Sequence, residues 1–232
     1  LEAVGIKTVP TGIDHGTITA VIEAGPIEVT TLREDLETDG RHAEVGFTDD
    51  WAKDAGRRDL TMNALYLSFN GQVFDPLGTG LSDAQSGLVR FAGDAKTRIE
   101  EDYLRLLRYF RFAAKYARQP FEPATLAVCQ ALAPELTRLS GERVQTELFK
   151  LLKNQNPLPT VQQLNQLDIL QSFWPQQDLQ YFTRYLTASA DLDIEPALRL
   201  RAWLGNDQTL LKNTAARLKL SSLHKSQLLD PL

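Results

Sequence analysis

One stretch of the chain places four charged side chains at regular helical spacing. Asp102 is followed by Arg105, Arg108 and Arg111, three residues apart. Residues three apart are neighbours on a helix surface, so one carboxylate would precede three guanidinium groups. A carboxylate can accept a hydrogen bond from a base edge, and a guanidinium can bind phosphate through two parallel hydrogen bonds. The spacing therefore indicates a nucleotide site, and a solvent-exposed face with stabilising ion pairs is the alternative.

The sequence around these side chains predicts a single helix over residues 100–115. This stretch has no Gly or Pro and is rich in Leu, Arg and Ala. Its first three residues are acidic, and they would complement the positive end of the helix dipole. Arginine stands at each basic position where lysine would suffice for solubility, which favours planar, two-pronged recognition.

Composition sets broad limits on the fold and the partners. The chain has 232 residues, 43% of them hydrophobic, enough for one large core or two modest domains. Its net charge of −5 does not by itself indicate a nucleic-acid binder. The charge is uneven, however, since residues 1–50 carry eleven acids and three bases, and residues 90–120 carry eight bases and four acids. This distribution favours a metal-dependent enzyme that handles phosphates.

No apolar run is long enough to cross a membrane, and no signal peptide is visible. The single cysteine, Cys129, excludes an internal disulfide and is predicted to be a buried structural thiol. The sequence begins without Met, so we interpret it as a fragment of a longer protein.

The first half of the chain predicts strands and loops. Residues 15–23 and 27–32 alternate as a hairpin, and Pro26 favours a connection longer than two residues. Glu28 in the second strand is either an exposed glutamate or a metal-binding or catalytic carboxylate. Residues 7–16 and 34–46 are predicted to be loops, because turn-forming and polar residues dominate them.

A second polar group precedes a predicted helix over residues 60–69. Arg57, Arg58 and Asp59 lead into this helix, and Asn63 lies inside it. Asparagine is disfavoured within helices unless its amide has a hydrogen-bonding role. The group could contact a phosphate and a sugar, and plain surface charge is the alternative. From residue 122 onward the pattern is helical, so the predicted fold is α+β: a small mixed β-sheet followed by a helical array.

Six motifs occur in one order between residues 7 and 153. They read IEVTTLRED, TDGRHAEV, RRDLTMNAL, DPLGTGLSD, EEDYLRLLRYFRF and LSGERVQTELFKLL. This ordered set resembles the class II CCA-adding tRNA nucleotidyltransferases and the related bacterial poly(A) polymerases. The motif sequences are most similar to those of alphaproteobacterial and mitochondrial CCA-adding enzymes. The resemblance implies a partial nucleotidyltransferase palm over residues 1–93, a nucleotide-selecting neck over 94–153 and an RNA-binding helical body and tail over 154–232.

The same resemblance implies that Asp102 and Arg105 select the incoming base, with Glu101 supporting the pair. The carboxylate would accept from the amino group of cytosine or adenine, and the guanidinium would donate to the adjacent ring nitrogen. Uracil and guanine present a carbonyl and a ring N–H there, which leaves buried polar groups unpaired and rejects those bases.

The remaining implied roles concern the triphosphate, the sugar and the metal. The triphosphate would be held by Arg58, Arg108 and Arg111. Arg57, Asp59 and Asn63 would shape the sugar and phosphate pocket. Residues 7–16 would be a flexible loop that adjusts the site, and Glu28 would be a third active-site carboxylate.

The family's Asp-x-Asp motif, which binds two Mg²⁺ ions, is expected before Leu1. Asp191 and Asp193 form an Asp-x-Asp in the helical region and do not replace it. Because phosphoryl transfer of this kind relies on metals and positioning, the chain alone is expected to be inactive. Basic residues of the body and tail would contact RNA, but the sequence does not single them out: Lys150, Lys153, Arg199 and Arg201 are candidates no better than the other basic residues.

The resemblance implies an enzyme that adds C, C and A to tRNA 3′ ends from CTP and ATP and releases pyrophosphate. A poly(A) polymerase, an enzyme that adds only CC or only A, and a non-catalytic RNA-binding protein stay open. The protein would be cytoplasmic in a bacterium and mitochondrial in a eukaryote. The sequence indicates no membrane association and no obligatory protein partner.

Overall fold

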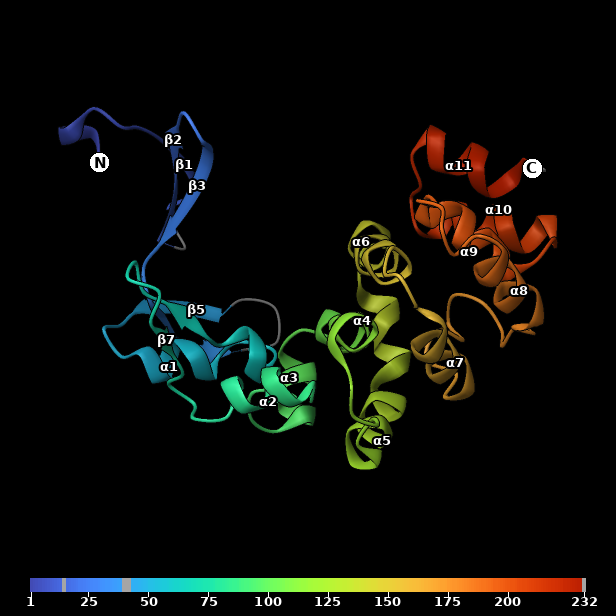
Figure 1. Ribbon diagram of the computed structural model, residues 1–232, viewed down its shortest axis with the longest axis horizontal. Coiled ribbons are helices and arrows are strands. Elements are labelled where there is room, and N and C mark those ends of the chain that lie inside the picture. The colour runs from blue at the N-terminus through green and yellow to red at the C-terminus, as the bar shows by residue number, and fades with distance from the viewer. Residues whose placement is uncertain (14–15, 39–42, 231–232) are drawn as a thin grey trace.

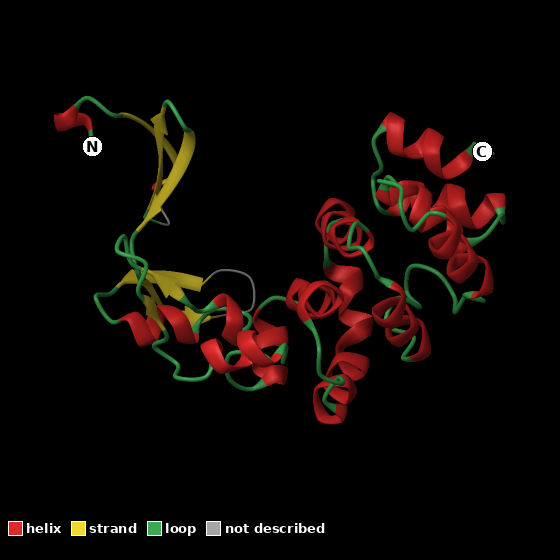
Figure 2. Cartoon of the chain, viewed as in Figure 1, coloured by secondary structure: helices red, strands yellow, loops and turns green. Residues whose placement is uncertain are grey.

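The computed structural model describes residues 1–13, 16–38 and 43–230 (Figure 1). Strands occupy the N-terminal part of the described chain and helices the remainder, which confirms the predicted α+β class (Figure 2). The strands are β1 Lys7–Gly12, β2 Thr17–Ile22, β3 Gly25–Thr30, β4 Arg33–Thr38, β5 Ala43–Phe47, β6 Tyr66–Leu67 and β7 Val73–Phe74.

The described strands form three separate antiparallel sheets, so the prediction of one mixed sheet is wrong in this detail. The sheets are β1-β2-β3, β4-β5 and β6-β7. Each pairing joins consecutive segments through a short connection, and such a connection permits only antiparallel pairing. In the β2–β3 hairpin, Ile22 pairs with Gly25 and leaves a two-residue turn. Pro26 lies inside edge strand β3, where a missing N–H is tolerated, so it does not lengthen the turn.

Two predicted loops contain strands. The segment 7–16 contains β1, and the segment 34–46 contains most of β4 and β5. In β1, Thr8 and Val9 pair with Ala20 and Thr19, so cross-strand pairing of β-forming residues outweighs the turn-forming residues around them. The Asp-Gly-Arg-His run over residues 39–42 lies outside the described residues.

The predicted helix over residues 60–69 is replaced by a short 3₁₀ helix, Thr61–Asn63, and strand β6. Tertiary contacts explain the difference. The Thr61 hydroxyl donates to the buried carboxylate of Asp83 over 2.6 Å, and Tyr66 pairs with Phe74 across β6 and β7. These bonds stabilise the extended path more than a helix of residues 60–69 would.

The α-helices account for most of the remaining described chain. They are α1 Trp51–Gly56, α2 Gly80–Ser86, α3 Ala95–Glu101, α4 Leu104–Tyr116, α5 Pro123–Leu132, α6 Gly141–Leu152, α7 Leu158–Gln166, α8 Gln180–Ala188, α9 Pro196–Leu204, α10 Gln208–Arg217 and α11 Ser222–Leu229. Further 3₁₀ helices are Glu2–Val4 and Ala133–Arg138. No helix of the described chain is both long and apolar enough to cross a membrane.

The core runs through the helical part, and α4 lies within it. Leu106 and Phe110 of α4 are fully buried, as are Val144 and Leu152 of the neighbouring helix α6. Cys129 is also fully buried, which confirms the predicted structural thiol, and burial raises the pKa of this thiol to about 12. Sheet β1-β2-β3 lies away from this core (Figure 1).

Candidate nucleotide-binding site

The predicted helix over residues 100–115 is broken at Asp102. Helix α3 ends at Glu101 and α4 begins at Leu104, and Asp102 between them has an extended backbone with φ −154° and ψ 106°. The Asp102 Oδ1 atom accepts from the backbone N–H of Leu104 over 3.1 Å, so its side chain replaces a helical bond. The acidic residues before it therefore end one helix and do not begin another. Asp102 is consequently placed at a junction.

Arg105, in the first turn of α4, is fixed on three sides. Its Nη1 atom donates to the carbonyl oxygen of Arg98 over 3.2 Å and to the carboxylate of Glu101. Its Nη2 atom donates to the carbonyl oxygen of Arg57 over 3.1 Å. Glu101 also pairs with Arg98, whose Nη1 atom donates to the Gly56 carbonyl over 2.9 Å. The guanidinium is thus held in one orientation against the preceding helix and α1.

The second oxygen of Asp102 pairs with a residue that the sequence analysis missed. Oδ2 accepts from Nη2 of Arg143, in α6, over 2.7 Å. The side chain of Arg143 is 48% exposed, so this ion pair lies at the surface of the site. The two residues are far apart in sequence, and the only signal was an arginine near the start of a regularly amphipathic helix.

Asp59 lies deeper and ties the segment before the 3₁₀ helix to α4. Its side chain is 5% exposed, and its Oδ2 atom accepts from Nε of Arg108 over 2.5 Å. Its Oδ1 atom accepts from Nδ2 of Asn63 over 2.9 Å and from the N–H of Leu60 over 3.0 Å. Burial opposes ionisation of this carboxyl, but the bonds from Arg108 and Asn63 outweigh it and hold its pKa below the ordinary value. The amide of Asn63 therefore has the hydrogen-bonding role that the sequence required.

A second buried carboxylate, Glu147 of α6, was also missed. It pairs with Nε of Arg111, and Nη1 of Arg108 lies 4.0 Å from its Oε1 atom. Together with Asp59 these side chains form a chain of alternating charges, which we call the anchoring network: Asp59, Arg108, Glu147 and Arg111. Its signal in the sequence was a glutamate on the otherwise apolar face of α6.

Arg57 and Arg58 converge on a third buried carboxylate. Asp54 accepts from Nη2 of Arg58 over 2.9 Å, from Nε of Arg57 over 3.3 Å and from the hydroxyl of Tyr66 over 2.6 Å. Burial again opposes ionisation, and bonds from Tyr66, Arg33 and Arg58 hold the pKa of Asp54 below its usual value. The side chain of Arg58 keeps 40% exposure, enough to reach a ligand.

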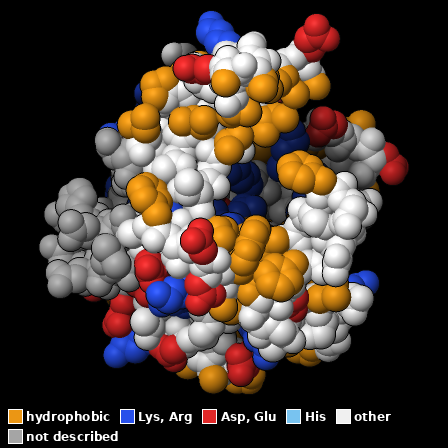
Figure 3. Space-filling view, turned by 90° about the vertical axis from the view of Figure 1, so that its left-hand side faces the viewer, with side chains coloured by type: hydrophobic (Ala, Val, Ile, Leu, Met, Phe, Trp, Pro, Cys, Tyr) orange, Lys and Arg blue, Asp and Glu red, His pale blue; other side chains and the backbone are white. Residues whose placement is uncertain are grey.

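Six of the predicted residues line one pocket of about 310 Å³. The lining residues are Arg58, Asp59, Asn63, Asp102, Leu104, Arg105, Arg108 and Arg143. Four guanidinium groups and two carboxylates therefore surround a space suited to an anion with a polar, planar end. Seen from the N-terminal side, basic side chains lie in a recess at the centre of the face (Figure 3).

The structure does not bring every predicted residue into this pocket. Glu101 and Arg57 contact the lining residue Arg105 but do not line the pocket, and Arg111 is one step further away, because it pairs with Glu147. Glu28 is exposed in β3 opposite Thr19, outside the pocket. Among the described residues, the structure brings together no group of three or more His, Cys, Asp or Glu side chains that could hold a metal ion.

The expected RNA contact is wrong for Arg199. This side chain is buried, and its Nη1 atom donates to the carbonyl oxygens of Leu152 and Asn154 over 2.5 and 2.6 Å. Arg201 similarly donates to the carbonyl oxygen of Leu228. Arg199 therefore joins α9 to the end of α6 and cannot reach an external ligand.

Comparisons with known proteins show which family the chain is similar to. The family model of the poly A polymerase head domain matches residues 2–90, and that of the probable RNA and SrmB-binding site of polymerase A matches residues 120–180. The mitochondrial CCA tRNA nucleotidyltransferase 1 of Homo sapiens is 46% identical over 171 residues, 72% of this chain and 39% of that protein. A CCA-adding enzyme of Streptococcus pyogenes is 42% identical over 153 residues, 65% of this chain and 38% of that protein.

A solved structure extends the likeness over nearly the whole chain. The Bacillus stearothermophilus CCA-adding enzyme in complex with CTP superposes with a TM-score of 0.74 at 27% identity, and the match covers 96% of this chain and 54% of that one. The chain thus spans 39% and 38% of the two curated relatives. The two family models, the two relatives and the solved structure all indicate the same family. The chain belongs to the family of CCA-adding tRNA nucleotidyltransferases and poly(A) polymerases.

Proposed function

We propose that the whole protein adds C, C and A to the 3′ ends of tRNA, using CTP and ATP and releasing pyrophosphate. The observation that carries the proposal is that Asp102, at the break between α3 and α4, and Arg105, in the first turn of α4, line one pocket with Arg58 and Arg108. The names of the relatives support the same activity.

In this proposal Asp102 and Arg105 read the base. An oxygen of Asp102 accepts from the exocyclic amino group of cytosine or adenine, and Arg105 donates to the adjacent ring nitrogen. Glu101 keeps Arg105 oriented, since its carboxylate binds the same guanidinium. Uracil and guanine would place a carbonyl oxygen against the carboxylate and a ring N–H against the guanidinium, so neither hydrogen bond could form. Each buried group left unpaired would cost about 1–3 kcal/mol. Discrimination therefore comes from polar groups left without partners.

Arg58 and Arg108 hold the triphosphate in the proposal. Both guanidiniums line the pocket, and each is held in place by a buried carboxylate behind it, Arg58 by Asp54 and Arg108 by Asp59. Asn63 and Asp59 shape the sugar side, Arg111 supports Arg108 through Glu147, and Arg57 supports Arg105 through its carbonyl oxygen. Arg143 is a positioning residue, because it orients the carboxylate of Asp102 from α6.

Further parts of the proposal lie beyond the pocket. The segments 1–93, 94–153 and 154–232 act as partial palm, neck and RNA-binding body and tail. Mg²⁺ is held by an Asp-x-Asp pair expected before Leu1, with Glu28 as a third carboxylate. The protein acts in the cytoplasm of a bacterium or in mitochondria of a eukaryote.

The test uses the whole protein and a tRNA that ends before its CCA. It is incubated with Mg²⁺ and CTP, with Mg²⁺ and ATP, or with both nucleotides, and the product 3′ ends are sequenced. We expect two C residues from CTP alone and a stop after CCA with both. Long A tails from ATP alone would instead identify a poly(A) polymerase. No extension by a protein that carries an intact Asp-x-Asp would leave RNA binding as its function.

A further inference from the structure

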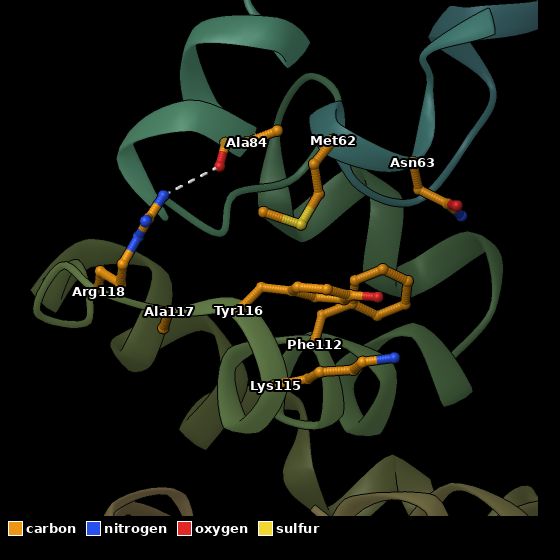
Figure 4. A pocket seen from close by; sticks show the side chains of 8 residues that line it. All are labelled: Met62, Asn63, Ala84, Phe112, Lys115, Tyr116, Ala117 and Arg118. Atoms are coloured by element: carbon orange, nitrogen blue, oxygen red, sulfur yellow. Dashed lines mark hydrogen bonds between the residues drawn. The ribbon is translucent and has the colours of Figure 1, made fainter. Parts of the chain in front are cut away.

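A hollow of about 640 Å³ lies beside the nucleotide pocket, between the C-terminal end of α4 and the segments around the 3₁₀ helix and α2. Its lining residues are Met62, Asn63, Ala84, Phe112, Lys115, Tyr116, Ala117 and Arg118. Met62 and Asn63 lie on one side, and the rings of Phe112 and Tyr116 lie on the other (Figure 4). The function proposed above assigns no role to this space.

Two aromatic rings form one wall of the hollow. Phe112 and Tyr116 are one turn apart on α4, with ring centroids 5.6 Å apart and an angle of 42° between the rings. Tyr116 is 43% exposed, although most of the apolar side chains of α4 are buried. Partly exposed rings at this spacing offer flat apolar surface to a planar ligand.

The charge around the rings is positive. Nζ of Lys115 lies 5.1 Å from the centroid of the Tyr116 ring. Arg118 donates to the carbonyl oxygens of Ala84 and Gln85, which fixes its charge at the edge of the hollow (Figure 4). Among the described residues no carboxylate lines this space. A ligand that is flat in one part and anionic in another, such as a nucleotide unit, matches both properties.

The hollow adjoins the nucleotide pocket directly. Asn63 lines both spaces, and its amide donates to Asp59 of the anchoring network. Arg111 of the same network lies over the Phe112 ring, 4.3 Å from its centroid. A base stacked on Phe112 and Tyr116 would therefore lie next to the incoming nucleotide. The hollow is open to solvent, and Lys115 and Arg118 provide two separate positive charges along it. Both properties suit single-stranded RNA, which must enter and leave the site.

We propose that this hollow stacks one base of the single-stranded 3′ end of the RNA acceptor, while Lys115 and Arg118 contact its phosphates. The proposal rests on the proposed function, since an acceptor RNA is what nucleotide addition requires. Stacking is tolerant of base identity, because every base has a flat face. The site would therefore accept the growing end after each addition.

The test measures stacking and nucleotide binding separately on the chain. The RNA probe is six adenylates long and carries 2-aminopurine as its 3′ base, whose fluorescence is quenched when it stacks. Affinity is measured for the unmodified chain, for Tyr116→Ala, for the conservative Tyr116→Phe and for Tyr181→Ala, which removes an exposed tyrosine of α8. CTP affinity is measured by calorimetry for each protein.

We expect Tyr116→Ala to weaken RNA binding by roughly fivefold to a hundredfold and to abolish the quench. Tyr116→Phe should retain both, Tyr181→Ala should match the unmodified chain, and CTP affinity should change much less than RNA affinity. Equal RNA binding by the two alanine variants would overturn the stacking site. If 5′-AMP displaced the probe at the same concentration as unlabelled RNA, the hollow would be assigned to a free nucleotide and the proposal would fail.

A second measurement does not depend on folding of the variants. The unmodified chain is photocrosslinked to an RNA with 4-thiouridine at its 3′ end, and the attached peptide is identified. Attachment within residues 112–118 supports the proposal, and attachment confined to other segments contradicts it. Failure of the unmodified chain to bind CTP would instead count against the proposed function, because the RNA measurements do not use CTP.

Discussion

The nucleotide pocket has a buried half and an exposed half that are built differently. In the anchoring network, Asp59 and Glu147 are buried and each is bonded to an arginine of α4. At the other side, Asp102 is half-buried and pairs with the exposed Arg143 at the surface. Both halves contain carboxylate–arginine pairs, but removing water from such a pair makes a lost partner far more costly.

This difference in burial separates residues whose ion pairs stabilise the pocket from residues that can exchange their hydrogen-bond partners. A buried carboxylate such as Asp59 or Glu147 keeps its arginine, because water cannot replace that partner. The half-buried carboxylate of Asp102 can give up or share its partner at a smaller cost in free energy, since water can take the place of Arg143. We therefore expect substitutions in the anchoring network to change stability most, substitution of Asp102 to change nucleotide choice most, and substitution of Arg143 to change nucleotide affinity.

The largest loss of stability is expected for Glu147→Gln. Gln keeps the size of the side chain but removes the charge that Arg111 and Arg108 face, so the free energy of unfolding should fall by about 3 kcal/mol. Urea denaturation of the chain measures this. Glu142→Gln is the matched control, since Glu142 is an exposed glutamate of the same helix paired with Lys219 over 3.0 Å. If the free energy of unfolding fell no more for Glu147→Gln than for that control, the anchoring network would not stabilise the fold.

A smaller, pH-dependent loss is expected for Asp59→Asn. At neutral pH we expect a loss of about 2 kcal/mol, because Arg108 loses its bonded carboxylate and keeps only the more distant Glu147, 4.0 Å from its Nη1 atom, as a charged partner. The folded-state pKa of Asp59 lies below its unfolded value, so its contribution is fully present above roughly pH 4 and is lost as the pH falls through the folded pKa. The difference from the unmodified chain should therefore shrink in acid. Urea denaturation at pH 7, 5, 4 and 3 measures it, and a constant difference would contradict the assignment.

The site residues that share one segment were predicted from the sequence, whereas the contacts between distant segments were not. The RRD motif, Asn63 and the arginines of α4 were found because residue type and spacing are local. The α+β order and the buried Cys129 followed from composition and periodicity. Arg143 and Glu147 were missed because their partners lie in other segments, and the local signal of each, one charged residue on an amphipathic helix, does not show what it contacts.

The break at Asp102 shows why a strong local pattern can still fail. Residues 100–115 have high helix propensity, but Arg105 and Arg98 bond to carbonyl oxygens of Arg57 and Gly56. These distant bonds, with the Asp102 side chain capping the N–H of Leu104, outweigh the few helical bonds lost. The break thereby places the Asp102 carboxylate at the junction between α3 and α4, a position that it would not have in a continuous helix.

Substitution of Asp102 separates capping from recognition. Asp102→Ala should cost about 1 kcal/mol of stability through the lost bond to Leu104, and Asp102→Asn only a few tenths, because Asn also caps helices well. Both variants should lose most of the preference for CTP over UTP, about tenfold, because the charged acceptor is gone. Calorimetric titration of both nucleotides measures the preference. Retained preference in Asp102→Asn would remove Asp102 from base selection.

The smallest effect on stability is expected for Arg143→Ala, about 0.5 kcal/mol or less, because the ion pair with Asp102 is exposed. CTP affinity should fall by roughly threefold, and the preference over UTP should persist, since the carboxylate is still present but less well oriented. Salt should erase most of this difference, because exposed charges are screened. The measurement is CTP titration at low and high ionic strength. Tighter CTP binding by the variant would instead mean that Arg143 competes with the base for Asp102, and the exposed half of the pocket would then be a self-blocked site.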